Sequence, residues 1–539
     1  MRRNRPGRGR VRTAVACAAT AAVLGPLIWL WQASLLPSAY SVMDMGYADY
    51  GGGPQGSHGA HSTGAASTHD GTPSTGGTST HDGTHSTGGT SAHPGTHSTG
   101  GASAPGGERD VTELVADADR PADVTVTVVA RKQRFRLASG RAFDGYTLNG
   151  QSPGPVIKAV QGRLVQVRLV NESVPGGITL HWHGVDVPNA ADGVAGVTQD
   201  AVGIGKEFTY RFVADRAGTF WYHSHQMSHE QVRGGLLGAL VVTPAKAAGA
   251  DRADDIVALV HLYGGIRTVN GREGDVQVKA PPGTRARVRV INTEYGVMPA
   301  WVSGAPYRLV AVDGTDVNGP APVRDQAVAV AAGGRADLEV TMPADGSPVR
   351  IHLGGPAGVV LGSTSYDAPP VPRPAATLDP LTYGTRAPLG FDPAEPDRRF
   401  EYDVGRRPGF LDGVPGVWWT INGHLYPDVP MFHVTEGDVV RMRISNNSGE
   451  AHPMHLHGHH AVVLTRDGVA ATGSPWWVDS LEVGIGQTYE IAFVADNPGV
   501  WMDHCHNLPH ASEGLTAHLM YEGVTTRFTI GGSADNKPE

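Results

Sequence analysis

The sequence predicts an all-β protein made of three β-sandwich domains, and three observations support this fold class. Apolar and polar residues alternate in short runs, such as 164–169 and 288–290, which is the pattern of a strand with one buried face. Glycine and proline are frequent, at 73 and 39 of 539 residues, which indicates many turns and argues against a helical bundle. In addition, one sequence pattern occurs three times, as expected for repeated domains.

The first element is a basic stretch followed by an apolar one. Six arginines lie within the first 12 residues, and residues 13–36 carry no charge. A basic start before an apolar run is typical of an export signal, and this run is also long enough to cross a bilayer. We therefore expect residues 1–36 to be a signal peptide or a membrane anchor. The body would be extracytoplasmic, either secreted or anchored to the outer face of the cytoplasmic membrane.

The second element, residues 37–108, is expected to be a low-complexity linker. It is rich in Gly, Ser and Thr and contains seven histidines, and such a composition cannot bury a core. We expect a disordered tether. Two interpretations of its histidines remain open, a plain spacer and a weak recruiter of metal ions.

The remaining elements are the three repeats. Each copy has an Asn-Gly pair, at Asn149, Asn270 and Asn422, and Asn-Gly is typical of tight turns. A glycine follows in each copy, with an arginine six residues and an asparagine nine residues after it. We expect three domains, at residues 109–245, 246–378 and 379–539. A second block, Phe-Val-Ala-Asp eleven residues before a histidine, occurs only in the first and third copies, at Phe212 and Phe493.

Charge and cysteine content exclude some classes of protein. The formal net charge is −9 although six arginines lie in the first 12 residues, so the body is acidic and does not suit nucleic-acid binding. The two cysteines are Cys17, inside the apolar segment, and Cys505. No disulfide framework is therefore available. Cys505 is a lone thiol in a body expected to be extracytoplasmic, which calls for a functional explanation.

Histidines of the body are concentrated in His-x-His pairs. Eighteen histidines lie beyond residue 108, for which random placement would give roughly one such pair. Residues i and i+2 of a strand point to the same side, so each pair presents two imidazoles to one point. Imidazole binds copper, zinc, iron or nickel, and this many imidazoles indicates a metal cluster. The pairs are His181/His183, His223/His225, His455/His457, His457/His459 and His504/His506.

The segment around Cys505 predicts a second metal centre. If residues 504–506 form a strand, the two histidines face one way and the thiol faces the other. Cys505, His452 and His510 together form a Cys-His-His set, which is the ligand set of blue copper. The tenth residue after the cysteine is Leu515, which cannot supply an axial bond, so a high reduction potential is expected. Zinc is an alternative metal, but structural zinc sites usually contain more cysteine.

These motifs resemble the four copper motifs of the three-domain, laccase-like multicopper oxidases, over about residues 120–530. The resemblance implies cupredoxin-like Greek-key domains and four copper ions. It implies roles for Cys505, His504 and His506 in electron transfer and for Asp192 in proton handling. One departure is Ala511, where several bacterial members have Glu. The implied ligands are His452, Cys505 and His510 for type 1 copper, His181 and His455 for type 2 copper, and His183, His223, His506, His225, His457 and His504 for the type 3 pair.

The activity implied by the resemblance is one-electron oxidation of phenols or aromatic amines, coupled to four-electron reduction of O₂ to water. Two alternatives remain open: a cuprous oxidase in copper resistance, and a copper-binding electron-transfer protein without O₂ chemistry. The expected partners are O₂ and a small reductant, and we expect a monomer because three domains suffice for one cluster. The other histidines of the body are expected at the surface or hydrogen-bonded, namely His229, His261, His352, His424, His433, His459, His460 and His518.

Overall fold

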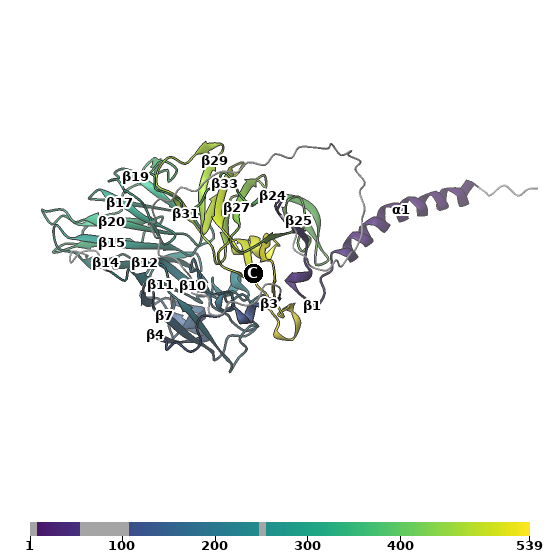
Figure 1. The fold of residues 1–539 in the computed structure, drawn as a ribbon, viewed down its shortest axis with the longest axis horizontal. Coiled ribbons are helices and arrows are strands. Elements are labelled where there is room, and N and C mark those ends of the chain that lie inside the picture. The colour runs from purple at the N-terminus through teal and green to yellow at the C-terminus, as the bar shows by residue number, and fades with distance from the viewer. Residues whose placement is uncertain (1–7, 54–106, 247–254) are drawn as a thin grey trace, which may run out of the picture.

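The computed structural model describes residues 8–53, 107–246 and 255–539, and strands dominate its body (Figure 1). Most of the expected linker and its seven histidines lie outside the described residues, so its disorder stays a prediction. The apolar N-terminal segment forms helix α1 (Arg8–Ala33), which extends away from the body in Figure 1. Within it, Val15–Ala33 is long and apolar enough to cross a membrane, a property that export signals share.

Each of the three sandwiches consists of two sheets. In the first sandwich the strand orders are β5-β4-β7-β9 and β6-β11-β10-β8. In the middle sandwich they are β13-β12-β15-β20-β17-β18 and β14-β22-β21-β16-β19-β23. In the third they are β25-β24-β27-β33-β29-β30, with β31 on β29, and β2-β26-β35-β34-β28-β32. The all-β sandwich fold predicted from the sequence is therefore confirmed.

The strands of the first sandwich are β4 (Val124–Arg136), β5 (Ala142–Leu148), β6 (Ile157–Val160), β7 (Leu164–Asn171), β8 (His181–His183), β9 (Glu207–Val213), β10 (Gly218–His223) and β11 (Leu237–Thr243). Those of the middle sandwich are β12 (Asp255–Tyr263), β13 (Ile266–Val269), β14 (Val276–Lys279), β15 (Arg285–Asn292), β16 (Met298–Ser303), β17 (Tyr307–Val312), β18 (Thr315–Asp316), β19 (Gln326–Val330), β20 (Arg335–Thr341), β21 (Val349–Leu353), β22 (Gly358–Gly362) and β23 (Ala376–Thr377).

The strands of the third sandwich are β24 (Arg398–Leu411), β25 (Val414–Ile421), β26 (Pro430–Val434), β27 (Val439–Asn446), β28 (His452–Leu456), β29 (Ala461–Arg466), β30 (Val469–Ala470), β31 (Trp476–Val478), β32 (Ser480–Val483), β33 (Thr488–Val494), β34 (Val500–Cys505) and β35 (Thr516–Tyr521). The short elements outside the sandwiches are β1 (Ala39–Tyr40), β2 (Tyr47–Asp49), β3 (Arg109–Asp110), β36 (Val524–Thr525), β37 (Ile530–Gly531), η1 (Val42–Asp44), η2 (Val111–Glu113), η3 (Asn189–Ala191), α2 (Ser228–Gln231), α3 (Leu508–Ser512) and η4 (Gly532–Ala534).

The threefold sequence pattern has the same geometry in every copy. The three turn asparagines adopt a positive φ of 52–54°, and each is followed by a glycine that also has a positive φ. A left-handed pair of this kind is the turn that matches the twist of an antiparallel hairpin. In each copy the asparagine Oδ1 accepts a hydrogen bond from a backbone N–H of the neighbouring strand. The pairs are Val129 with Asn149, Leu259 with Asn270, and Asp403 with Asn422, at 2.6, 2.9 and 2.8 Å.

Residues 37–53, which the sequence analysis placed in the linker, pair with the third sandwich. Strand β2 adds to β26 in parallel, and β1 pairs with β37. Val42 and Met45 are buried, and the Tyr40 hydroxyl lies 2.7 Å from that of Tyr426. The segment contains aromatic and thioether side chains that can bury surface, unlike the Gly/Ser/Thr-rich stretch after it, and this explains why it folds.

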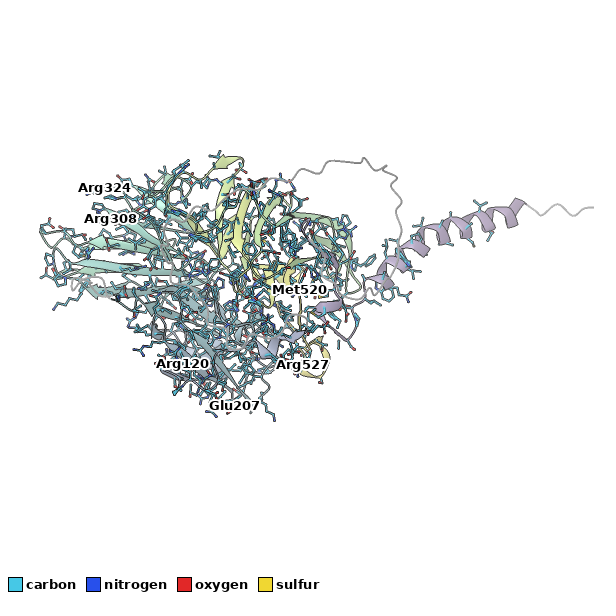
Figure 2. All side chains as sticks on the ribbon, in the orientation of Figure 1. Arg120, Glu207, Arg308, Arg324, Met520 and Arg527 are labelled. Carbon is cyan, nitrogen blue, oxygen red and sulfur yellow. The ribbon has the colours of Figure 1, made fainter. Side chains whose placement is uncertain are left out.

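The core shows which sandwiches are joined. One continuous hydrophobic cluster runs through the first and third sandwiches, whereas the middle sandwich has a cluster of its own. Figure 2 shows the charged side chains of Arg120 and Glu207 at the outer edge of the molecule, while Met520 of β35 is buried in the shared cluster. The first and third sandwiches therefore pack closely, and the histidine pairs lie where they meet. The predicted domain boundaries stay a prediction.

Candidate metal centre

Two pairs of strands bring eight histidines together between the first and third sandwiches. In the first sandwich β8 pairs with β10, so that His181 lies opposite His223. In the third, β28 pairs with β34, so that His455 lies opposite His504. All eight side chains are buried: His181, His183, His223, His225, His455, His457, His504 and His506.

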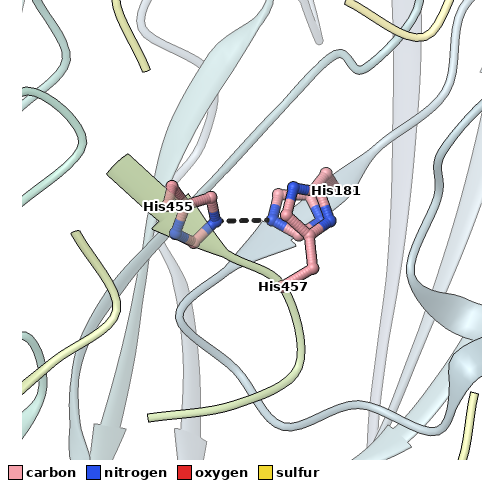
Figure 3. A group of neighbouring side chains, drawn as sticks. All are labelled: His181, His455 and His457. Atoms are coloured by element: carbon pink, nitrogen blue, oxygen red, sulfur yellow. Dashed lines mark hydrogen bonds between the residues drawn. The ribbon is translucent and has the colours of Figure 1, made fainter. Parts of the chain in front are cut away.

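Contacts between the two sandwiches are direct. The Nε2 atoms of His181 and His455 lie 3.4 Å apart, as the dashed line in Figure 3 marks. The ring of His457 stacks on that of His181 with centroids 3.8 Å apart, and the two rings overlap in Figure 3. On the other side, the Nε2 atom of His504 lies 3.4 Å from that of His225 and 3.2 Å from that of His457.

The hydrogen bonds of these rings determine which nitrogen carries the proton. Nδ1 of His181 lies 2.9 Å from the carbonyl oxygen of Asp192, and Nδ1 of His455 lies 2.7 Å from that of Asp479. Nδ1 of His504 likewise lies 3.1 Å from a carbonyl oxygen. A carbonyl oxygen can only accept, so each Nδ1 carries the hydrogen and each Nε2 presents a lone pair. Lone pairs facing each other at 3.4 Å repel unless a cation lies between them.

The pKa values of the rings also favour a cation bound between these histidines. Burial, followed by the neighbouring imidazoles, lowers the pKa of His455 and His457 well below the usual value for histidine. The pKa of His504 is lowered to about 3, mainly by burial. These three rings are therefore neutral at pH 7 and available as ligands. In addition, His183 Nδ1, His223 Nε2 and both ring nitrogens of His506 are buried without a hydrogen-bond partner among the described residues, as expected for atoms that bind a metal.

Two buried carboxylates orient the ligand rings. Asp192 places Oδ1 3.1 Å from Nδ1 of His181 and Oδ2 3.1 Å from Nδ1 of His457. Asp479 places Oδ1 3.2 Å from Nε2 of His183. Carboxylates in this position fix ring orientation and make the opposite nitrogen a better ligand. Asp192 was predicted from the sequence, whereas Asp479 was not.

Asp479 is part of a buried charge network that sequence reasoning missed. Arg335, at the start of β20 in the middle sandwich, donates from Nη1 to Asp479 Oδ1 at 2.6 Å and from Nη2 to Oδ2. Asp313 accepts from the backbone N–H groups of Arg335, Asp479 and Ser480. The middle sandwich thus supports the histidine cluster without contributing a histidine to it. Arg335 and Asp479 are 144 residues apart in the chain, so no local motif marks the pair.

A second candidate centre lies behind strand β34. The Sγ atom of Cys505 is 3.6 Å from Nδ1 of His452 and 3.8 Å from Nδ1 of His510, and the two Nδ1 atoms are 3.1 Å apart. Burial raises the pKa of the Cys505 thiol well above its usual range. Only a bound cation would therefore give the thiolate at neutral pH. Leu515 is fully buried and accepts a hydrogen bond from the Cys505 backbone N–H through its carbonyl.

Aromatic and charged side chains that the sequence analysis did not identify surround this set. Trp419 of β25 packs against His510 and His452, with ring centroids 4.4 and 4.8 Å apart. Its Nε1 donates to Glu513 at 2.8 Å, so an acid lies beside the Trp419 ring. Arg406 lies over the Trp419 ring at 4.3 Å. Arg406 and Trp419 come from the β24–β25 hairpin, which carries no metal-binding motif, so only the pairing of this hairpin in the fold brings them here.

The structure groups the donor atoms of the predicted ligands into small sets. Donor atoms within 4.8 Å of one another are found in the sets His452-Cys505-His510, His225-His457-His504 and His181-His455-His457. His506 meets the cluster through ring contacts, with centroids 4.9 Å from His183 and 5.5 Å from His223. The structure thus brings all the predicted ligands into two adjacent centres. Which ion each one binds stays a prediction.

Among the histidines without an expected metal role, one differs from the prediction. His459 uses both nitrogens, one toward the carbonyl of His457 and one toward the Tyr521 hydroxyl. His518 was expected at the surface or hydrogen-bonded, but it is buried, and within the part of the chain that the structure describes neither ring nitrogen has a hydrogen-bond partner. Its strand, β35, lies between β26 and β34, and Met431 and Met502 flank it, so apolar neighbours replace polar ones.

Comparison with known proteins gives matches along most of the body. Two models of the multicopper oxidase family match residues 130–247 and 394–523. Laccase-1 of Botryotinia fuckeliana is 28% identical over 73% of this chain and 81% of its own length. Multicopper oxidase MmcO of Mycobacterium tuberculosis is 28% identical over 75% of this chain and 89% of its own length. The iron transport multicopper oxidase fetC of Epichloe festucae is 27% identical, covering 69% and 72%.

Solved structures agree with these matches. A multi-copper oxidase from Pseudomonas thermotolerans superimposes with a TM-score of 0.59 at 27% identity, covering 74% of this chain and all of that one. Fet3p, a multicopper oxidase of iron import, superimposes with a TM-score of 0.63 at 22% identity, covering 74% and 90%, which supports the fold alone. Members of this family are oxidoreductases that use four copper ions, O₂ and a reductant, and the histidine clusters of this chain are compatible with that copper content. The family matches, the relatives and the copper-compatible clusters together identify the chain as a member of the multicopper oxidase family.

Proposed function

We propose that this protein is a laccase-like oxidase that removes single electrons from phenols or aromatic amines and reduces O₂ to water. The observation that carries the proposal is the exposed carboxylate beside the outer edge of the His510 ring. Its Nε2 atom lies 3.5 Å from Glu450 Oε2, and the glutamate side chain is 48% exposed. A carboxylate beside this edge can accept the proton of a phenol hydroxyl that approaches His510. Phenols become acidic on losing an electron, so a proton acceptor here assists their oxidation.

Copper would be bound by the residues already described, and bound copper would supply the one-electron redox chemistry and the reduction of O₂. The neutral imidazoles and the single thiol suit copper better than zinc, because structural zinc sites close with four ligands, usually richer in cysteine. The proposed sets are His452, Cys505 and His510 for type 1, His181 and His455 for type 2, and His183, His223, His506, His225, His457 and His504 for type 3.

The chain itself links the two centres. At the end of β34 the Cys505 thiol faces His452 and His510, while the rings of His504 and of His506, the residue after the strand, face the histidine cluster. The Cys505 centre and the histidine cluster are therefore connected by the covalent bonds between adjacent residues of the chain. We therefore assign Cys505, His504 and His506 to electron transfer. Asp192, buried between His181 and His457, is the proposed proton-handling group on the cluster side.

The location and assembly of the protein are part of the same proposal. Helix α1 is exposed along its apolar stretch, which supports an export signal or an anchor that places the body outside the cytoplasmic membrane. Both sandwiches that supply the histidines belong to one chain, so a monomer suffices for a complete cluster. The acidic body argues against a nucleic-acid partner.

A metal-ion oxidase, such as a cuprous oxidase in copper resistance, is the second candidate. Glu450 and Glu513 both lie near His510 and could attract a cation. However, Arg406 Nη1 donates to Glu450 at 2.7 Å, and its guanidinium lies over Trp419. A fixed positive charge at this entrance opposes the approach of a cation. A copper protein without O₂ chemistry would leave the eight interface histidines without a role.

The test is a comparison of substrates with variants at both ends of the electron route. Cys505→Ser should abolish the intense blue absorption and oxidase activity while circular dichroism stays that of a β protein. Glu450→Gln should lower kcat/KM for phenols roughly tenfold or more, as expected on losing a general base, and leave cuprous ion oxidation almost unchanged. Full activity of Cys505→Ser would refute the assignment of the site. A preference for cuprous ion that exceeds turnover of every phenol and amine would favour the second candidate.

A further inference from the structure

We propose that the tip of the β24–β25 hairpin rests on the outer surface of a lipid bilayer beside helix α1, so that the Cys505 centre faces the membrane. The inference rests on the proposed anchoring by α1. It adds a second membrane contact, made by the folded body, and a fixed orientation for the edge at which the reductant would react. The contacts that carry it are those between α1 and the hairpin turn.

Helix α1 has the properties of a bilayer-spanning anchor with a defined direction. Arginines 8, 10 and 12 lie at its N-terminal end, and the helix carries no acidic residue in its first turn. Trp29 and Trp31 lie at the other end and are 67% and 44% exposed. Arginines mark the cytoplasmic end of a span, and tryptophans concentrate at the membrane–water interface. Trp31 and the residues that follow it would therefore lie at the outer surface of the bilayer.

The end of the span contacts the hairpin turn directly. The turn is Asp412-Gly413, and both residues adopt positive φ, of 46° and 73°. The Leu36 backbone N–H donates to Asp412 Oδ1 at 3.1 Å, and the Gly413 N–H donates to Ser34 Oγ at 3.1 Å. A methyl group added to Gly413 would lie 2.8 Å from Leu35 Cδ2 and 3.0 Å from Trp31 Nε1, so the turn lies in close contact with the end of the helix. Figure 1 shows α1 joining the body beside β24 and β25.

The exposed surface of the hairpin suits a bilayer. Val414 and Val417, next to the turn, are 55% and 54% exposed. Phe410 and Leu411 lie on the facing strand, paired with Pro415 and Val414. Behind this apolar tip comes the pair Arg407 and Trp418, with the arginine exposed.

An apolar tip followed by tryptophan and arginine is the order of side chains expected across the headgroup region, where arginine meets anionic lipid phosphates. The one carboxylate in the tip, that of Asp412, accepts a hydrogen bond from the Leu36 N–H. The tip lies beside the end of helix α1 that would emerge from the bilayer. The surface that the tip would contact is therefore that of the same bilayer.

The same hairpin links the membrane to the Cys505 centre. Trp419 pairs with Arg406 in the β24–β25 ladder and packs on His510. Trp419 is the fifth residue after Val414, a distance of about 17 Å along a strand. The His510 edge would therefore lie close to the layer in which amphipathic phenols concentrate.

The experiment uses the full-length, copper-loaded protein in vesicles of phosphatidylcholine and phosphatidylglycerol, with Cys17→Ser as background. An environment-sensitive fluorophore is attached to Val414→Cys. The chain offers a matched control in Val469→Cys, because Val469 also follows an Asp-Gly turn with positive φ and is 60% exposed. Its hairpin, β29–β30, lies at the opposite edge of the same sheet from β25. A quencher on the lipid headgroup region reports proximity to the bilayer.

We expect the label at position 414 to be quenched roughly twofold or more, and the label at 469 to be unchanged, as for a residue at the interface compared with one in water. Equal quenching at the two positions would overturn the proposal, as would protein that fails to float with the vesicles. Turnover of a soluble phenol by the same two labelled proteins in detergent is measured separately. Loss of that turnover would count against the oxidase function, whereas the quenching result bears only on the membrane contact.

Discussion

Replacing Arg335 by Met tests whether the middle sandwich supports the copper cluster. Arg335 is fully buried and faces two carboxylates, Asp479 and Asp313, that are buried as well. It also donates from Nε to the carbonyl of Thr219 at 3.0 Å, which links it to the first sandwich. Methionine has a similar length but no charge and no donors. The variant therefore leaves two buried carboxylates without a counter-charge and releases the group that positions His183.

The magnitude follows from the geometry. Breaking a buried ion pair by removing one partner costs about 3–5 kcal/mol of folding free energy. The pKa of Asp313 is already raised to about 6 by burial and by Asp479, and loss of Arg335 removes the charge that opposes this rise. A carboxyl whose folded-state pKa is raised stabilises the fold below its unfolded pKa, and this contribution is lost as pH rises through the folded pKa. The penalty should therefore be larger at pH 8 than at pH 5. Copper affinity should fall about 10–100-fold, as is typical when a residue supporting a ligand is removed.

The assay combines urea denaturation of the copper-free protein at both pH values with copper content after dialysis against a weak chelator. Arg350→Met is the matched control. Arg350 is buried in the middle sandwich and binds Asp275 through both Nη atoms, at 2.5 and 2.7 Å, and no copper ligand is among its partners. It should lose stability but keep its copper. If Arg335→Met and Arg350→Met retain the same copper content, the supporting role assigned to Arg335 and Asp479 is wrong.

Three further predictions concern single positions. Leu515→Met should lower the reduction potential of the Cys505 centre, because a thioether adds an axial donor, and redox titration of the blue absorption should show no change if Leu515 does not face the copper. His518→Leu should gain stability relative to wild type as pH falls from about 6.5 to 4. Burial lowers the pKa of His518 to about 4, so only the unfolded wild-type chain binds a proton in that window. The relative gain should reach about 3 kcal/mol in denaturation at the two pH values, and a constant difference would contradict it. Asp192→Asn should lower kcat about 100-fold when activity is expressed per bound copper, since an amide cannot carry a proton, and an unaltered pH–rate profile would exclude the proton role.

The sequence by itself determined the fold class and the types of side chain that the two candidate centres bring together. Asn149, Asn270 and Asn422 predict turns because Asn-Gly adopts positive φ at low cost, and local backbone chemistry needs no tertiary information. The His-x-His spacing likewise predicts two rings on one side of a strand, and His504-Cys505-His506 predicts a thiol on the other. These inferences depend on strand periodicity alone, so they transfer directly from sequence to structure.

Only the tertiary structure decided what surrounds those ligands. Arg335 and Asp479, and Trp419 and His510, are far apart in the chain and meet through sheet pairing and packing between sandwiches, for which no local pattern exists. The folded segment at residues 37–53 and the buried, unpartnered His518 depend in the same way on the strands that flank them. Spacing along one strand specifies which atoms can bind a metal. The burial and charge that tune those atoms come from elements that are brought together only when the chain folds.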